Sequence, residues 1–104
     1  MTSVDTDQRF WLITAWDKPG LLETRLAHYD EHRAYLNAAT IDIVMAGPTV
    51  ADDGDTPTGS FFVVRAQSRD EAAAFNAGDP FNLNGVWGEI DIREFLLRRG
   101  KVQL

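Results

Sequence analysis

The fold is decided by the stretch Arg9-Phe10-Trp11-Leu12-Ile13-Thr14-Ala15-Trp16, in which aromatic and β-branched side chains predominate. Such side chains favour strands, and the run ends at the turn-forming cluster Asp17-Lys18-Pro19-Gly20. A second run of the same kind, Phe61-Phe62-Val63-Val64, lies within residues 59–66. Both stretches predict strands whose central side chains are all large and apolar.

The segment between these strands begins with apolar residues at the spacing of an amphipathic helix. Over residues 21–37 the apolar side chains recur at intervals of four, three and seven, at Leu22, Leu26, Tyr29 and Leu36. Residues 41–46 are apolar and β-branched around a single acid, which predicts a strand. This strand is expected to end at Gly47-Pro48, because proline cannot donate to a sheet.

The chain then turns before a second helix. Residues 49–58 are rich in Gly, Pro and Asp and predict an exposed loop. Ser68 and Glu71 have the spacing of a capping box, which predicts a helix that begins at Ser68 and ends near Gly78 in a left-handed conformation. Asp79-Pro80-Phe81 predicts a tight turn or a short helix after it.

Residues 85–95 alternate in polarity and predict a half-exposed final strand. Ile90 and Ile92 are expected on one side of it, and Trp87 with the charged residues on the other. The order strand, helix, strand, strand, helix, strand is that of the ferredoxin-like βαββαβ fold, an α+β fold with a four-stranded antiparallel sheet and both helices on one face. We expect one domain over residues 1–104, with a core at 8–96 and tails at 1–7 and 97–104.

Composition narrows the classes of partner. The 104 residues carry 16 acidic and 10 basic side chains, a formal charge of −6, so nucleic acid and anionic membranes are not expected as partners. The basic run Arg98-Arg99-Gly100-Lys101 is interpreted as a solvated tail. The lack of cysteine excludes disulfides and thiol chemistry, and residues 1–8 lack a signal-peptide pattern, so we expect a cytoplasmic protein.

The two apolar strands also predict a homodimer. Helices cover one face of this fold, so strands of a monomer should alternate between apolar and polar side chains. In residues 10–13 and 61–64 they do not, which places apolar groups on the helix-free face as well. Each such side chain left in water forgoes about 1.5–3 kcal/mol. A second copy packed on this face is the favoured explanation, and a closed pocket on one protomer is the alternative.

The order of several short motifs resembles that of the YCII-related family. The motifs are residues 25–36, then Ala46-Gly47-Pro48, Thr58-Gly59-Ser60 and Asp79-Pro80-Phe81. The resemblance covers almost the whole chain and implies a dimeric α/β-barrel fold. It also implies an active-site pair in a shared cleft, with the family histidine at His32 and the family aspartate at Asp79.

The residues themselves leave these roles open. His32 lies beside the apolar stripe of its helix, where a half-buried imidazole near a carboxylate suits acid–base chemistry. Asp79 before Pro80 is also a plain helix N-cap. His28 and His32 have a spacing that can bind zinc, but no third ligand is in register, so neither a metal nor another cofactor is expected.

Four further residues are candidates for binding a substrate: Tyr35, Ser60, Phe81 and Trp16. Tyr35 lies one turn beyond His32, and Ser60 opens a strand with a hydroxyl. Phe81 and Trp16 offer aromatic walls. Each also has a simpler explanation, either core packing or a hydrogen bond at the start of a strand.

Three functions fit these residues. The first is an enzyme of the lyase or dehydrochlorinase kind that the resemblance implies, in which His32 moves a proton on a small molecule and Asp79 orients the imidazole. The second is a dimeric binding or accessory protein that recognises a small ligand without turnover. The third is a cofactor-independent monooxygenase of the broader barrel superfamily. Fold alone does not choose among them.

Overall fold

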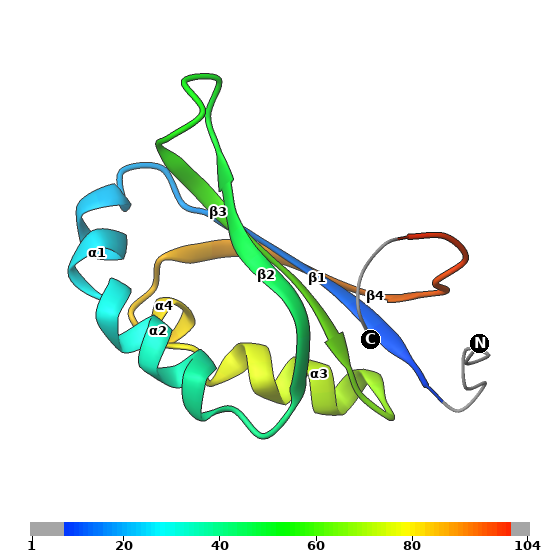
Figure 1. Ribbon diagram of the computed structural model, residues 1–104. Coiled ribbons are helices and arrows are strands. Elements are labelled where there is room, and N and C mark those ends of the chain that lie inside the picture. The colour runs from blue at the N-terminus through cyan, green and yellow to red at the C-terminus, as the bar shows by residue number, and fades with distance from the viewer. Residues whose placement is uncertain (1–7, 101–104) are drawn as a thin grey trace.

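The computed structural model describes residues 8–100 (Figure 1). The tail predicted at residues 1–7 lies outside the described residues, and so do residues 101–104 of the tail predicted at 97–104, including Lys101 of the basic run. The elements are β1 (Phe10–Asp17), α1 (Leu22–Ala27), α2 (Tyr29–Ala38), β2 (Asp42–Val50), β3 (Pro57–Arg65), α3 (Arg69–Ala77), α4 (Pro80–Leu83) and β4 (Trp87–Phe95).

The four strands form one antiparallel sheet in the order β2-β3-β1-β4. All four helices lie on the same side of it (Figure 1). This is the ferredoxin-like α+β arrangement, so the predicted fold class is confirmed. Within residues 8–100, none of the helices has the length and apolar character needed to cross a membrane.

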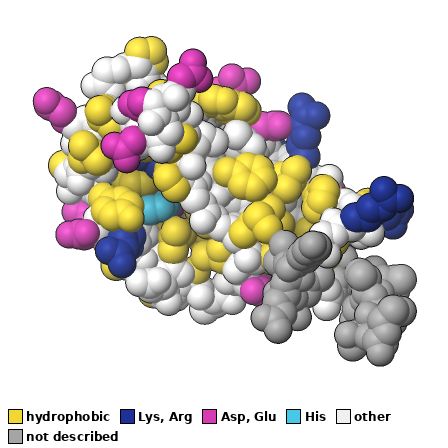
Figure 2. Space-filling view, turned by 45° about the horizontal axis from the view of Figure 1, so that its top comes forward, with side chains coloured by type: hydrophobic (Ala, Val, Ile, Leu, Met, Phe, Trp, Pro, Cys, Tyr) yellow, Lys and Arg dark blue, Asp and Glu magenta, His cyan; other side chains and the backbone are white. Residues whose placement is uncertain are grey.

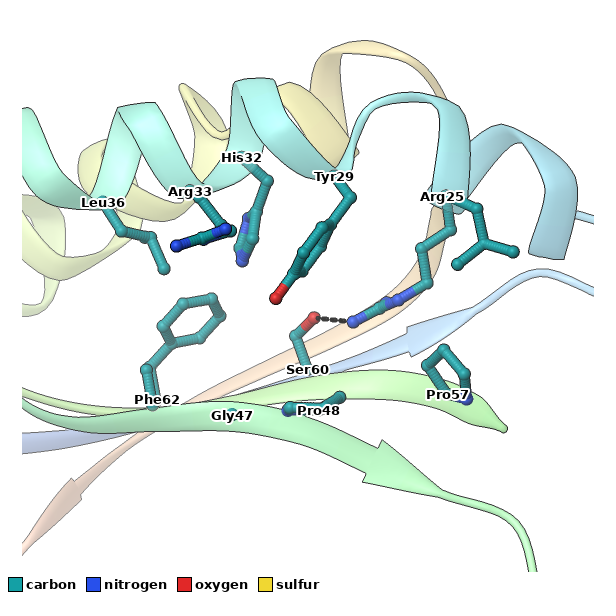
Figure 3. Close-up of a pocket in the computed structure, with 12 residues that line it drawn as sticks. Arg25, Tyr29, His32, Arg33, Leu36, Gly47, Pro48, Pro57, Ser60 and Phe62 are labelled. Carbon is teal, nitrogen blue, oxygen red and sulfur yellow. Dashed lines mark hydrogen bonds between the residues drawn. The ribbon is translucent and has the colours of Figure 1, made fainter. Parts of the chain in front are cut away.

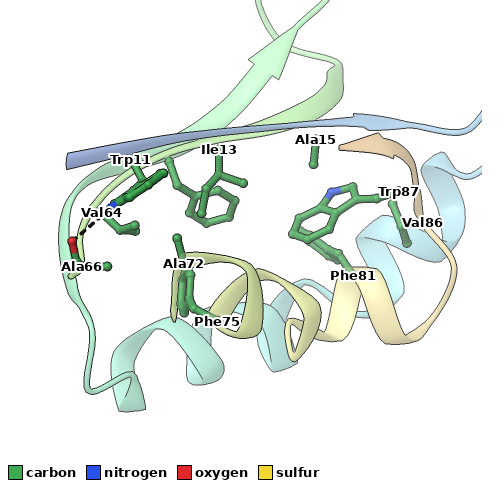
Figure 4. Packing of buried hydrophobic residues seen from close by; sticks show 11 residues of the cluster. Trp11, Ile13, Ala15, Val64, Ala66, Ala72, Phe75, Phe81, Val86 and Trp87 are labelled. Carbon is green, nitrogen blue, oxygen red and sulfur yellow. Dashed lines mark hydrogen bonds between the residues drawn. The ribbon is translucent and has the colours of Figure 1, made fainter. Parts of the chain in front are cut away.

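The core lies between the sheet and the helices (Figure 4). Ile13 of β1 and Val64 of β3 are fully buried there, and Phe75 of α3 packs against the same cluster. The indole of Trp11 closes one end of the core and donates to the carbonyl of Ala66 at 3.0 Å. The buried aromatic and β-branched side chains of the two central strands therefore hold the helical layer in place.

The helix-free face is also largely apolar. Phe10 and Val63 are buried on it, Leu12 and Phe61 are half-buried, and Met45 of β2 is 42% exposed. A hollow of about 320 Å³ separates this part of the sheet from the segment that follows β4, and apolar side chains form most of its lining. The central strands thus bury apolar groups on both faces, as the sequence predicted.

Strand β2 is longer than expected. The sequence predicted that it would end at Gly47-Pro48, but pairing with β3 continues through Pro48, opposite Ser60, to Val50. β2 is an edge strand, so Pro48 can take a place in it without breaking a ladder on its outer side. The exposed loop is correspondingly shorter than residues 49–58.

The prediction for the faces of β4 was wrong at Trp87. The register with β1 shifts between Ala15, which pairs with Ile90, and Asp17, which pairs with Trp87. One extra residue of β4 therefore stands opposite Trp16, and such a bulge reverses which face the preceding side chains take. Trp87 joins Ile90 in the core and is only 3% exposed.

The long helix predicted for residues 21–37 is divided at His28. His28 has φ −105° and ψ 12°, and its N–H lies 3.2 Å from two carbonyl oxygens, those of Thr24 and Arg25. His32 N–H donates to the His28 carbonyl at 3.0 Å, so α2 begins immediately after α1 ends. The two helices change direction at this residue and both remain over the sheet (Figure 1).

The start of α3 follows the predicted capping box, with one change. Ser68 Oγ accepts from the Glu71 N–H at 3.2 Å, and the Glu71 carboxylate accepts from the Gln67 N–H, one residue before the cap. The left-handed stop expected at Gly78 is wrong, because its φ is −83°. A side chain here would instead collide with Tyr35, since a Cβ would lie 2.6 Å from the phenol oxygen.

Candidate active site

A buried histidine and aspartate meet beneath helix α2. Nδ1 of His32 lies 2.8 and 2.9 Å from the two carboxylate oxygens of Asp79. The Asp79 carboxylate is an acceptor, so Nδ1 carries a proton and Nε2 is the nitrogen left for a ligand. His32 is 9% exposed and Asp79 1% exposed. The structure thus brings together the two residues that the sequence singled out as a catalytic pair.

Asp79 also caps helix α4. Its Oδ1 accepts from the backbone N–H of Phe81 at 2.8 Å, and Pro80 takes the first helical position. The simpler explanation for Asp79, an N-cap, is therefore correct, and the same carboxylate contacts His32 as well. One side chain both starts the short helix and fixes the tautomer of the imidazole.

The imidazole is held from the side by aromatic rings. Phe81 is stacked on His32, with ring centroids 4.1 Å apart and planes 13° apart. Phe62 meets His32 edge-on at 6.3 Å, and Trp87 meets both Phe62 and Phe81 in the same way. Contacts of this kind leave the imidazole little freedom to rotate.

His32 lines a pocket of about 310 Å³ between α1, α2 and the β2–β3 edge of the sheet (Figure 3). This volume lies at the small end of the range for ligand sites. The polar side chains of its lining are Arg25, Tyr29, His32, Arg33 and Ser60. Its remaining lining is formed by Leu26, Leu36, Ala46, Gly47, Pro48, Pro57 and Phe62.

Arg25 forms a second buried polar group at this pocket. It is 5% exposed, and its guanidinium donates to Asp17 at 2.8 Å and to Ser60 Oγ at 3.0 Å. Burial raises the pKa of the Asp17 carboxyl, while the charge of Arg25 opposes that shift. The guanidinium carbon also lies 4.5 Å from the centre of the Phe81 ring.

Sequence reasoning missed Arg25 and Asp17 as site residues. Arg25 precedes His32 by seven positions, a spacing that places two side chains on the same side of a helix. That spacing could have drawn attention to it. Asp17 belongs to a turn-forming cluster, so its burial against Arg25 follows from the packing of α1 on the end of β1 and from no local pattern.

The other predicted substrate-binding residues differ in position. Ser60 lines the pocket, and Phe81 lies behind it against His32. Trp16 is 44% exposed and is not among the lining residues. Its position does not favour the predicted role in binding a substrate.

Tyr35 also lies outside this pocket. Its hydroxyl donates to the Phe75 carbonyl at 2.7 Å, and its ring stacks on that of Phe75. Burial raises the pKa of the Tyr35 phenol, and the nearby Asp79 charge adds to the shift. The phenol therefore stays protonated at neutral pH and joins α2 to α3, so its position does not favour a role in substrate binding.

The two histidines do not converge. His28 Nδ1 lies 3.2 Å from the Glu31 carboxylate at the surface, whereas His32 turns inward to Asp79. Among residues 8–100, no group of three His, Cys, Asp or Glu side chains is placed to hold a metal ion.

Comparison with known proteins relates this chain to a family and to individual proteins. The model of the YCII-related domain matches residues 9–96. An uncharacterized protein of Haemophilus influenzae is 30% identical over 93 residues, which cover 83% of this chain and 95% of the relative.

Among solved structures, the chain is similar to the 5-chloro-2-hydroxyhydroquinone dehydrochlorinase from Burkholderia phenoliruptrix, determined in complex with 2,5-dihydroxybenzoquinone. The TM-score is 0.75 and the identity 33%, over 88% of this chain and 95% of the enzyme. The family match spans most of the sequence and includes both His32 and Asp79. This chain belongs to the YCII-related domain family.

Proposed function

We propose that this protein is a small-molecule enzyme in which His32 transfers a proton and Asp79 orients the imidazole. One observation carries the proposal: a buried imidazole bonded through Nδ1 to a buried carboxylate lines a pocket large enough for a single ring. An imidazole held in this way presents Nε2 as a base and is stabilised as a cation by the carboxylate.

The reaction class we propose is a lyase-like elimination, of which dehydrochlorination is one case. Nε2 of His32 takes a proton from the substrate, and the electron pair that is released forms a new double bond. The leaving group, such as chloride, departs with its own bonding electrons. This elimination transfers no electrons to an external acceptor, so the proposal includes no cofactor. Similarity to a dehydrochlorinase at 33% identity supports this class.

Release of chloride from 5-chloro-2-hydroxyhydroquinone tests this reaction. The unsubstituted protein is expected to release chloride, and His32→Ala to lower kcat/KM by about 10²–10⁴-fold, the usual contribution of a general base. Asp79→Asn keeps an oxygen for the cap of α4 but removes the charge that stabilises the imidazolium, so a smaller loss is expected. His28→Ala is the matched control, because His28 contacts Glu31 and does not line the pocket.

Two outcomes would contradict the proposal. Equal chloride release by the unsubstituted protein and by His32→Ala would remove the histidine from the reaction. Thermal stabilisation by 2,5-dihydroxybenzoquinone without chloride release would favour the alternative, a binding or accessory protein that recognises a small ligand without turnover.

We also propose that the protein acts as a homodimer through the helix-free face of the sheet, in the cytoplasm. The partly exposed Leu12, Phe61 and Met45 on that face support a second copy as cover. Sedimentation velocity should show a dimer that Met45→Glu dissociates. Leu83→Glu, at a 71% exposed position in α4, is the matched control and should leave the dimer intact. A monomer at micromolar concentration would contradict this assembly.

A further inference from the structure

The buried Arg25 is not used by the proton transfer proposed above, and its position calls for an explanation. Burying a guanidinium is costly unless it is paired, and Asp17 supplies one opposite charge. A guanidinium has five N–H groups, and within residues 8–100 two of its nitrogens have side-chain partners, Asp17 and Ser60. The remaining N–H groups belong to a side chain that lines the pocket.

Ser60 is prepared to donate in the same direction. Its hydroxyl oxygen accepts from Arg25 Nη2, so the hydroxyl proton is available for another acceptor. Ser60 is 2% exposed and lines the pocket. Arg25 and Ser60 together therefore offer donors at one place in the pocket lining.

The charge of the lining favours an anion. The whole chain carries −6, and acidic side chains are scattered over the surface in Figure 2, where a histidine lies among hydrophobic and basic groups. The described residues that line the pocket include two arginines, Arg25 and Arg33, and no carboxylate. Asp17 offsets the charge of Arg25 from behind, so Arg33 and the N–H donors of the lining are the groups that can attract a small anion to this site.

The spacing of the lining residues along β3 fits one ring. Figure 3 shows Arg25 and His32 on either side of Tyr29, with Ser60 beside the guanidinium of Arg25 and Phe62 below His32. Ser60 and Phe62 are two residues apart on the same face of β3, about 7 Å along the strand. A planar six-membered ring with substituents on opposite edges spans such a separation, and apolar residues border it on both sides.

We propose that Arg25 and Ser60 bind an ionised oxygen of a single-ring substrate at the end of the pocket opposite His32, with Asp17 as the positioning residue of Arg25. The ligand class is a small planar anion, such as a phenolate or a hydroxyquinone. The inference rests on the proposed function and adds to it. When His32 removes a proton, the released electron pair forms the new double bond as the leaving group departs, and the contacts of Arg25 and Ser60 with the ionised oxygen hold the ring in place against Nε2.

Calorimetric titration with two probes tests this assignment. One probe is 2,5-dihydroxybenzoquinone, an acidic hydroxyquinone that is anionic at neutral pH, and the other is hydroquinone, a neutral ring of similar size. The unsubstituted protein should bind the anion at least about tenfold more tightly than hydroquinone, since hydrogen bonds to charged groups are stronger than those between neutral groups. Arg25→Lys and Ser60→Ala should each weaken binding of the anion about tenfold to hundredfold. The affinity of each variant for hydroquinone should stay within about twofold of that of the unsubstituted protein.

Two further variants separate positioning from charge. Asp17→Asn removes a negative charge, which alone would strengthen binding of the anion. If Asp17→Asn instead binds the anion more weakly and hydroquinone as tightly as before, Asp17 is the residue that holds Arg25 in place. Arg93→Gln is the matched control for loss of an arginine, because its side chain is 76% exposed and lies outside the pocket.

The outcomes keep this inference distinct from the proposed reaction. His32→Ala should lose turnover and retain the preference for the anion, because it changes the other end of the pocket. Preference for the anion without any chloride release would support the inference while the proposed reaction fails. Chloride release that depends on His32, together with wild-type binding of both probes by Arg25→Lys and Ser60→Ala, would overturn the inference. So would an unsubstituted protein that does not prefer the anion.

Discussion

The two faces of the sheet are built in different ways. The helix-covered face buries polar side chains beside a pocket, and His32 contacts Asp79 there while Arg25 contacts Ser60. The helix-free face has apolar side chains over an apolar hollow. Buried polar groups cost stability unless they are hydrogen-bonded, whereas buried apolar groups add to it. The first face therefore has the character of a ligand site, and the second that of a packing surface.

The largest expected effect compares neighbouring residues of β1 on the two faces. Ile13 is fully buried under the helices, and Leu12 is half-buried on the open face. Ile13→Ala should lower the free energy of unfolding by about 2–5 kcal/mol, the usual cost of a core cavity. Leu12→Ala should cost less in a monomer. Denaturant unfolding at several protein concentrations measures both.

Protein concentration sharpens this comparison. If the open face binds a second copy, the unfolding midpoint of the unsubstituted protein rises with concentration, and Leu12→Ala weakens that rise. Ile13→Ala should leave the dependence on concentration unchanged. If the two variants lose the same free energy of unfolding at every protein concentration, the two faces do not differ as described.

The next effect concerns the polar pair under the helices. Asp79→Ala removes the cap of α4 and leaves His32 buried without its acceptor, which should cost about 2–4 kcal/mol of unfolding free energy. Asp79→Asn keeps the capping oxygen and should recover part of this loss. Chemical denaturation of the two variants side by side measures it. If Asp79→Ala leaves the free energy of unfolding unchanged, the pair is not part of the folded core.

Gly78 tests how closely the helices pack behind the pair. Gly78→Ala would bring a methyl group within 2.6 Å of the Tyr35 hydroxyl oxygen, so Tyr35 must move away from the Phe75 carbonyl. We expect a loss of about 1–3 kcal/mol, as for overpacking elsewhere. In a Tyr35→Phe background the same change should cost less, and a double-mutant cycle would measure the coupling. An identical cost in both backgrounds would place the strain elsewhere.

The smallest effect is a dependence on alkaline pH. The folded protein raises the pKa of Tyr35 above that of the unfolded chain, so it favours the protonated phenol. The stability that this adds is complete below about pH 10, the ordinary value, and is lost as the pH rises above it. Tyr35→Phe should lose less stability between pH 9 and the highest pH at which the fold persists. Parallel pH profiles of the two proteins would contradict this.

Local sequence patterns were sufficient to predict the central strands and the start of a helix. The aromatic and β-branched runs at residues 10–13 and 61–64 became the two central strands, and the Ser68 cap began a helix. The order of these elements was sufficient for the ferredoxin-like fold. The edge position of β2, which lets the strand continue through Pro48, arises because β3 pairs on its other side with the distant β1, so no local rule contained it.

The candidate site was predicted only in part for the same reason. His32 and Asp79 were placed together by the order of the family motifs, and the structure shows the contact between them. Arg25 and Asp17 form a pair across a turn that no periodicity describes. Tyr35 follows His32 by three positions, yet it points to α3, because Gly78 leaves room there for its ring.

The extra residue in β4 makes the spacing of that strand part of the site. Because of it, Trp87 turns inward and supports the Phe81 ring, which in turn supports His32. Deleting Gly88 or Glu89 would restore a strict two-residue alternation and turn the indole toward solvent. A deletion at this point is therefore expected to disturb the orientation of His32, although β4 contributes no residue to the lining of the pocket.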